Sequence, residues 1–213
     1  MTDADIPISR GRGRPPLRSD DDTRRLIAEA AMREFLARGY AGTSMDDVAR
    51  SAKVSKKTLY RLIPAKADLF KGSVTNRIAD FLREAEAKIG AADVADALER
   101  YLVELGSLAF SPNTIGVFRL AIAETERFPE LAASFYADAV LVGEGVLARF
   151  LQRQRALGIL KIDDPVAAAS MLRGMMVMEP QRAVMLGALP PPTPAETAKR
   201  ARECVRIFLH GCL

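Results

Sequence analysis

The chain has 213 residues, of which 49% are hydrophobic and 27% charged, and its formal net charge is +4. This length suits one medium domain or two small ones, and the hydrophobic content is sufficient for a packed core. The longest uncharged run, 105–118, contains Pro112 and is too short to span a bilayer. Because the N-terminus lacks the apolar segment of a signal peptide, we expect a cytoplasmic protein.

Basic residues are concentrated in the first third of the chain. Residues 1–77 contain 16 Lys and Arg against 10 Asp and Glu, whereas residues 78–213 contain 15 against 17. A basic end joined to a near-neutral remainder favours a DNA-contacting part and a body with another role. Cys204 and Cys212 would lie about 12 Å apart along one helix, too far for a disulfide. Two packed side chains are the simpler interpretation, and a redox switch across a dimer is the alternative.

An arginine-rich arm is predicted over residues 1–19. Its sequence from Arg10 to Pro16 is RGRGRPP, in which the glycines and prolines disfavour a helix. Arg12, Gly13 and Arg14 resemble an AT-hook, a short segment that follows the minor groove of A·T-rich DNA. A narrow minor groove concentrates negative potential, and glycine permits a close approach to its floor. The alternative is a disordered basic tail that adds only salt-dependent affinity.

The segment 43–70, TSMDDVARSAKVSKKTLYRLIPAKADLF, predicts two short helices joined by a tight turn. If Met45–Ser51 and Lys56–Leu62 are helical, the apolar side chains between them converge on one small core. These side chains belong to Val48, Ala52, Val54, Leu59 and Leu62. The pattern is that of a helix-turn-helix, in which one helix enters the DNA major groove while the other braces it.

Hydroxyl groups stand where the two helices would begin. Thr43 or Ser44 can cap the first helix, and Ser55 can cap the second. Asp46 or Asp47 would complete a capping box. Burial of the apolar positions leaves cationic and hydroxyl side chains outside, where they suit phosphate and base-edge contacts. These outward residues are Lys56, Lys57, Thr58, Tyr60 and Arg61. The alternative, an amphipathic helix pair with a solvated basic face, does not explain why caps and one-sided cations occur together.

With the preceding helix, RRLIAEAAMREFLARGY (24–40), this segment resembles the DNA-binding head of the TetR family of bacterial transcriptional regulators. The motifs TSMDDVA, VSKKTLY and PAKADLF follow it in the family's order, so the resemblance covers residues 24–70. It implies DNA-phosphate contacts for Thr43 or Ser44, Lys57, Tyr60 and Lys66, and positions nearer base edges for Lys56, Thr58 and Arg61. Lys53 stands in the turn where the family usually has glycine. A left-handed backbone there would cost about 1 kcal/mol, while the lysine would add a phosphate contact.

Beyond residue 70 the sequence predicts helices throughout the segment 71–213. They cover 69–89, 93–109, 114–126, a long stretch from the corner at 128–130 to Leu157, a helix capped by Asp164, and a last helix from Thr193 or Pro194 to near His210. An all-α protein follows, with a three-helix head at 20–70 joined to a helical bundle. The stretch 119–136 also resembles the C-terminal domain of some TetR-family members, which implies a ligand-binding and dimerisation role for the body.

Methionines recur at helical spacing on one predicted helix. Because methionine adapts to irregular space, this face is either ordinary core or subunit packing, or a plastic wall of a ligand cavity. Apolar faces and family analogy make neighbouring helices candidates for the other walls. The candidate ligand residues are Tyr101, Phe118, Ile122, Met171, Met175 and Met178.

The last two predicted helices carry two further signals. Pro180 removes a backbone donor inside its helix, so we expect a kink or break near Glu179. The final helix has an apolar stripe that faces either the core or a second subunit. The stripe consists of Ala198, Ala201, Val205, Phe208 and Cys212. The family resemblance favours the second subunit, with the last two helices forming a homodimer interface.

No catalytic pattern competes with this interpretation. His210 is the single histidine, and near a helix end it suits the helix dipole. The sequence has no GxSxG, P-loop or dinucleotide glycine pattern, and we expect no enzyme, metal or cofactor. We predict a sequence-specific DNA-binding regulator, a repressor released from a palindromic operator by a small apolar or amphipathic ligand. The alternative is a ligand-independent architectural DNA-binding protein.

Overall fold

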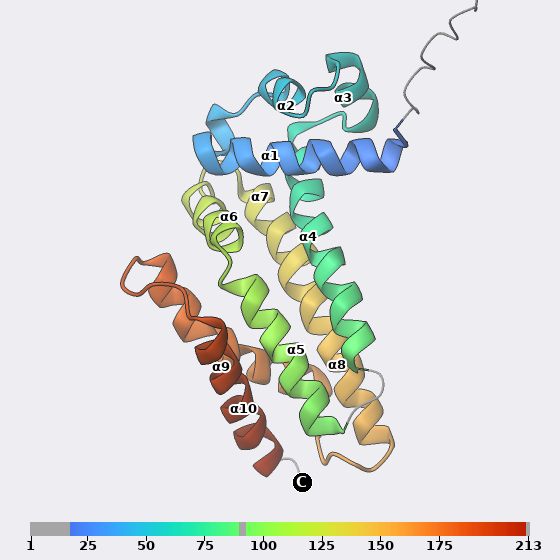
Figure 1. Ribbon diagram of the computed structural model, residues 1–213, viewed down its shortest axis with the longest axis vertical. Helices are drawn as coiled ribbons and strands as arrows, with labels where there is room; N and C mark the ends of the chain where they lie inside the picture. The colour runs from blue at the N-terminus through green and yellow to red at the C-terminus, as the bar shows by residue number, and fades with distance from the viewer. Residues whose placement is uncertain (1–17, 90–92, 212–213) are drawn as a thin grey trace, which may run out of the picture.

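The computed structural model describes residues 18–89 and 93–211, and the described chain contains helices and no strand. This confirms the predicted all-α class. Three helices form one end of the molecule, and a helical bundle extends from it (Figure 1). We call α1–α3 the head and α5–α10 the body.

The head consists of α1 (Asp20–Gly42), α2 (Met45–Ser51) and α3 (Lys56–Leu62). The long helix α1 lies across the end of the bundle, and α2 and α3 lie on its outer side (Figure 1). Within α1, Gly39 has a φ of 75° and interrupts the helical geometry one turn before the helix ends. Glycine adopts this conformation without a steric penalty.

The predicted apolar positions of the head meet in one core. Val48 and Leu59 are completely buried, and Leu62 is nearly so. They pack with Phe35 and Phe70, whose rings lie 5.7 Å apart edge to face. The same cluster continues into the body. It includes Val117, Ala121, Leu131, Phe135 and Ala139. The head is therefore held to the body by a shared apolar core.

One helix passes from the head into the body. This is α4 (Lys66–Ile89), which packs on α1 at one end and on α5 and α8 further along. The boundary predicted at residue 70 falls inside this helix. We propose that α4 belongs to both parts, so that a displacement of the body can be carried to the head by one rigid element.

Over the described residues, the body consists of six α-helices and one π-helical segment, and the short helix α7 continues directly into η1 and α8. Their bounds are α5 (Val94–Ala109), α6 (Pro112–Ala123), α7 (Pro129–Phe135), η1 (Tyr136–Leu141), α8 (Val142–Ala156), α9 (Pro165–Met185) and α10 (Pro194–His210). Side chains cap the predicted starts, since Asp93, Asp164 and Thr193 each accept a hydrogen bond from a backbone N–H in the first turn. The long predicted helix 128–157 contains the π-helical segment η1, which sequence periodicity did not predict.

Helix α9 continues through Pro180 to Met185, so a break near Glu179 is wrong, whereas the kink stays a prediction. Proline lacks the N–H that would bond to the carbonyl of Met176. In the structure that carbonyl instead accepts a hydrogen bond of 2.9 Å from Nε of Arg200, on α10. Arg200 also donates to the carbonyl of Met175. The Arg200 side chain of α10 thus supplies the hydrogen bond that the Met176 carbonyl would otherwise lack.

The apolar stripe predicted on α10 faces the core. Ala201 and Val205 are buried, and Phe208 packs against the same cluster, with α5 as the main neighbour of α10. The preference for a second subunit therefore needs correction for this stripe, because the apolar surface of α5 covers it. Cys204 is buried and unpaired, and Cys212 lies outside the described residues.

The continuous helical run Pro129–Ala156 is long and apolar enough to cross a membrane by length and composition alone. Some of its large side chains lie inside the protein, whereas Tyr136, Leu141 and Val142 are exposed. Phe135, Leu147 and Leu151 are buried in the two apolar clusters. Core packing accounts for these buried side chains, and 39% of the apolar window is buried in the structure.

Candidate nucleic-acid interface and internal cavity

Helix α2 begins at a complete capping box. Ser44 accepts a hydrogen bond from the backbone N–H of Asp47, and Asp47 accepts one from the backbone N–H of Ser44. The hydrogen bond from Ser44, with Arg38 and Arg50 nearby, holds the pKa of the Asp47 carboxyl below its usual value. The box predicted from the sequence is therefore formed with Ser44 and Asp47.

The turn between α2 and α3 depends on an unusual backbone at Lys53. Its φ of 55° makes it the only non-glycine residue with positive φ among the described residues. The N–H of Val54 bonds to the carbonyl of Ala49, and that of Lys53 to the carbonyl of Arg50. This is a Schellman motif, which normally places glycine at this position. The left-handed conformation predicted for Lys53 is therefore present.

Ser55 fixes the start of α3. Its hydroxyl oxygen accepts from the backbone N–H of Thr58 at 3.0 Å and lies 2.8 Å from the Thr58 hydroxyl. Because Leu59 and Leu62 anchor the inner face of this short helix, the opposite face is turned to solvent. The exposed residues on it are Lys56, Lys57, Tyr60 and Arg61, with Thr58 half-buried.

The exposed face of α3 combines free and paired cations. Within the described residues, the side chains of Lys57 and Tyr60 make no hydrogen bond or ion pair. Lys56 is paired with Asp46 of α2. Arg61 forms two hydrogen bonds of 2.8 Å to Asp20, at the start of α1. Hydrogen bonding to Arg61 lowers the pKa of the Asp20 carboxyl. No local pattern predicts this pair, because its members lie 41 positions apart in the chain.

Two predicted phosphate contacts, Thr43 and Lys66, have contacts within the protein, and of the two only Thr43 is buried. Thr43 is 2% exposed, and its hydroxyl donates to the carbonyls of Gly39 and Glu34. Its assignment to DNA therefore needs correction, because its polar atoms close the end of α1. Lys66 lies with Nζ 4.5 Å from the centre of the Tyr40 ring. Burial lowers the pKa of its ammonium group. The arm residues Arg12, Gly13 and Arg14 lie outside the described residues.

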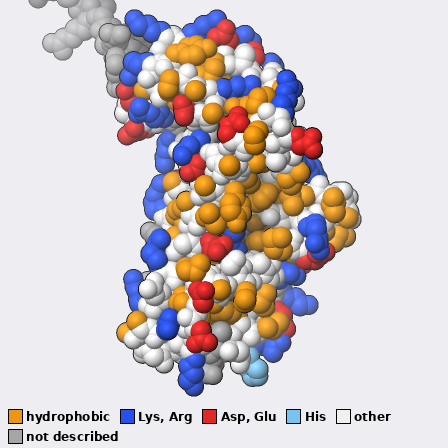
Figure 2. Space-filling view, turned by 180° about the vertical axis from the view of Figure 1, so that it is seen from behind, with side chains coloured by type: hydrophobic (Ala, Val, Ile, Leu, Met, Phe, Trp, Pro, Cys, Tyr) orange, Lys and Arg blue, Asp and Glu red, His pale blue; other side chains and the backbone are white. Residues whose placement is uncertain are grey.

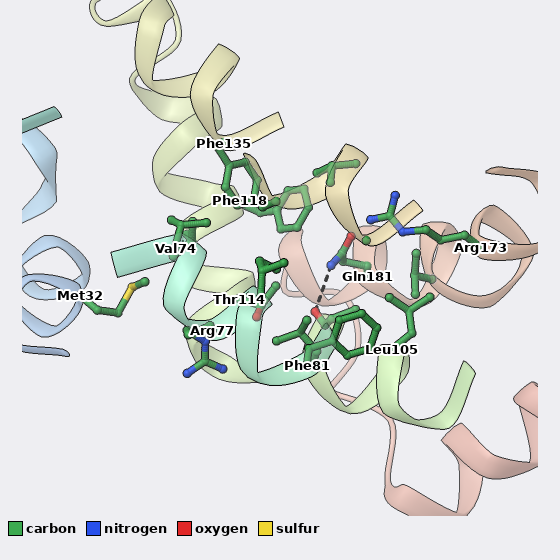
Figure 3. Close-up of a pocket in the computed structure, with 18 residues that line it drawn as sticks. Met32, Val74, Arg77, Phe81, Leu105, Thr114, Phe118, Phe135, Arg173 and Gln181 are labelled. Carbon is green, nitrogen blue, oxygen red and sulfur yellow. Dashed lines mark hydrogen bonds between the residues drawn. The ribbon is translucent and has the colours of Figure 1, made fainter. Parts of the chain in front are cut away.

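An apolar cavity of about 60 Å³ lies where α1, α4, α5, α6, α7, η1, α8 and α9 meet. Phe118 and Phe135 form one wall, with ring centres 4.7 Å apart at a right angle (Figure 3). The π-helical segment η1 contributes Ala139 and Val140; such irregular turns are frequent at functional sites. Polar groups at the cavity belong to Arg77, Thr114, Arg173 and Gln181, and none of its lining residues is acidic.

The predicted ligand residues do not surround this cavity. Phe118 is the one that lines it. Tyr101 is fully buried elsewhere, where its hydroxyl donates to the carbonyl of Gly143 and burial raises its pKa to about 12. Met175 packs against the body core. Ile122, Met171 and Met178 are 62–69% exposed. Family analogy selected the right helices but the wrong faces, since helical spacing does not show which face a neighbour covers.

The arrangement so far defines a helix-turn-helix DNA-binding protein with a helical body. Residues 27–72 match the family described as bacterial regulatory proteins, tetR family, and residues 96–211 match the C-terminal domain of AefR-like transcriptional repressors. The chain therefore belongs to the TetR family of transcriptional regulators, which are DNA-binding proteins of the repressor class and not enzymes.

Individual proteins support the same assignment. Over 132 residues, 62% of this chain, it is 37% identical to the uncharacterized HTH-type transcriptional regulator YhgD of Bacillus subtilis (strain 168), and the match spans 61% of that regulator's length. A TetR-family structure from Mesorhizobium loti MAFF303099 is 26% identical, with a TM-score of 0.80 over 92% of this chain and 99% of the other. The flavonoid-responsive regulator FrrA is 27% identical, with a TM-score of 0.71 over 90% and 97% of the two chains.

Proposed function

We propose that the protein is a homodimeric repressor that occupies a palindromic operator and leaves it when a small apolar or amphipathic molecule binds the body. The exposed cationic face of α3, set on a buried apolar face, is the observation that carries the DNA-binding part. Two such helices in a dimer would enter the major groove at half-sites about 34–36 Å apart. Since the family consists of bacterial DNA-binding regulators, we assign the protein to the cytoplasm.

The side chains of the head fall into two groups, one assigned to base edges and one to DNA phosphates. Arg61, with Lys56 and Thr58, is assigned to base edges, because a guanidinium can bind guanine through two hydrogen bonds. A second group is assigned to phosphates, where charge or a hydroxyl donor positions the protein without reading sequence. This group comprises Ser44, Lys53, Ser55, Lys57, Tyr60 and Lys66. The arm residues Arg12, Gly13 and Arg14 are assigned to the minor groove.

Exposed apolar side chains on α9 and α10 support dimerisation through the last two helices. Met171 and Met178 lie two turns apart on one exposed face of α9, and Ile207 of α10 is half exposed. Figure 2 shows hydrophobic side chains across the middle of the molecule and on the lobe formed by the turn between α9 and α10, where Leu186 is 77% exposed. Such exposed patches mark association surfaces. We therefore assign the exposed Met171 and Met178 to subunit packing, whereas Met175 packs against the body core.

The position of the cavity suggests how a ligand would act. It lies against α4, which begins directly after the head, and against α6, whose Gly116 packs so closely on Leu36 of α1 that an added Cβ atom would displace the end of that side chain. A ligand that widens this small cavity would displace helices that touch the head. It can shift the protein only through tighter binding to the displaced state. A coupling of about 1–3 kcal/mol would weaken operator binding roughly 5- to 150-fold.

Selection of bound fragments from genomic DNA, followed by transcription from a selected promoter in vitro, tests this function. The proposal expects one palindromic site per promoter, repression by the protein and relief by a compound that binds the body. Lys57→Ala/Arg61→Ala should abolish repression without unfolding the chain. Binding spread along DNA without a preferred site, unchanged by any body ligand, would instead establish the architectural alternative.

A further inference from the structure

One polar atom at the cavity is left without a partner. Nε of Arg173 is buried and has no hydrogen-bond partner among the described residues. The same guanidinium faces Glu144, but its Nη1 lies 3.8 Å from the carboxylate, beyond hydrogen-bonding distance. A buried donor without an acceptor is costly and rare in native proteins. This donor is therefore suited to an acceptor that arrives with a ligand.

The surroundings of Arg173 define what such an acceptor can be. The side chain extends from α9 toward the centre of the cavity wall, near Gln181 (Figure 3). The Gln181 amide donates to the carbonyl of Ala109 at 3.0 Å, which fixes its orientation. The second arginine, Arg77, already donates to Ser111 at 3.2 Å. Among the described residues, Arg173 is thus the cavity cation whose buried donor has no partner, and the remaining wall is mainly aliphatic and aromatic.

We propose that the cavity binds a monocarboxylic acid with a short apolar tail, whose carboxylate accepts a hydrogen bond from Nε of Arg173. A guanidinium has five donors, so Arg173 can bind a ligand carboxylate while keeping Glu144 beside it. Glu144 also sets a limit, because a head group with two negative charges would be repelled by it. A carboxylate entering this apolar space needs a cationic partner to offset its lost hydration, and Arg173 is that partner.

The size of the cavity restricts the tail. At about 60 Å³ it exceeds the space of one water molecule but is far below the roughly 300–1,000 Å³ of typical ligand pockets. A short chain or a single ring therefore fits only with some outward movement of the surrounding helices. The proposed function requires the same movement. The inference rests on that function only for the effect of the ligand on operator binding, because binding of the ligand itself does not depend on it.

Calorimetric titration of the full chain with octanoate, octanamide and octan-1-ol tests the proposal. Octanoate should bind about tenfold or more tightly than the two neutral analogues, since a hydrogen bond to a charged group discriminates by at least that factor. Arg173→Met should remove this preference while leaving octan-1-ol binding unchanged. Arg77→Met, the matched control at the same cavity, should keep it. Equal affinity for all three probes, binding of none, or a preference that survives Arg173→Met would overturn the proposal.

Two further variants keep the result interpretable. If Arg173→Met fails to fold, Arg173→Lys retains the charge but lacks the planar fork and should weaken octanoate alone. Glu144→Gln removes the competing carboxylate and should leave octanoate binding equal or tighter. Operator release is measured separately by fluorescence anisotropy. Octanoate that binds without releasing DNA contradicts the proposed function but not this inference. Release of DNA by octan-1-ol alone contradicts this inference but not the proposed function.

Discussion

The polar contacts within the head and those within the body differ in the sequence separation of the residues they join. In the helix-turn-helix, the defining polar contacts join near neighbours, as in the bonds of Ser44 to Asp47 and Ser55 to Thr58, three positions apart. In the body, Arg119 donates to the carbonyls of Val184 and Met185, more than 60 positions away, and Gln181 reaches Ala109 over 72 positions. Contacts between near neighbours can be predicted from the sequence pattern, whereas contacts between distant residues depend on how the helices pack.

The largest expected effect tests whether α3 depends on its buried face. Leu59→Ala should lower the free energy of unfolding by about 2–5 kcal/mol, because Leu59 is fully buried in the head core. Tyr60→Ala, one residue along and 48% exposed, should change it by less than about 0.5 kcal/mol. Urea unfolding followed by circular dichroism measures both. Similar losses for the two variants would mean that α3 is not oriented as described.

A double-mutant cycle tests the long-range contact at Pro180. Arg200→Met should cost about 1–3 kcal/mol, since it leaves the carbonyl of Met176, which faces Pro180, without a donor. In a Pro180→Ala background the restored backbone N–H can serve Met176, so the same substitution should cost less. Chemical denaturation of the four proteins gives the coupling. Additive effects would show that Arg200 does not compensate for the proline.

Lys53 offers a smaller test within the head. Lys53→Gly relieves the left-handed strain, about 1 kcal/mol, but increases the freedom of the unfolded chain. We therefore expect a net change in unfolding free energy between zero and about 1 kcal/mol stabilising, and no gain for Lys53→Ala. Both variants should reduce the salt dependence of DNA binding by about one phosphate contact. If Lys53→Ala stabilises as much as glycine, the turn is not strained.

The smallest expected effect concerns Asp20 and Arg61, a pair in the head whose members are 41 positions apart. Asp20→Asn frees Arg61 and should tighten operator binding about two- to fivefold, the range expected for an exposed ion pair. Because the folded-state pKa of Asp20 is lowered, the pair stabilises the fold above the carboxyl's ordinary pKa. This contribution disappears as the pH falls through the folded-state pKa. Thermal melts of both proteins should therefore converge in acid, and a constant difference would contradict the pairing.

The sequence predicted most of the head and the outline of the body. Caps at Ser44, Ser55 and Asp164 depend on residues within one turn, and they are formed as expected. The cavity could not be located in this way, because its walls come from eight helical segments and no local signal places Arg173 beside them. Thr43 shows the same limit, since its hydroxyl suits a surface cap equally well until the end of α1 is seen to enclose it.

The central claim is that α3 presents its cationic face to DNA twice in a dimer. Hydroxyl-radical footprinting on a selected operator tests it most directly. The account predicts two protected half-sites one helical turn apart, which disappear with Lys57→Ala/Arg61→Ala and persist with Arg153→Ala/Arg155→Ala, a matched pair of cations near the end of α8 far from the head. A single protected block without symmetry, or a footprint unchanged by the α3 variant, would contradict it.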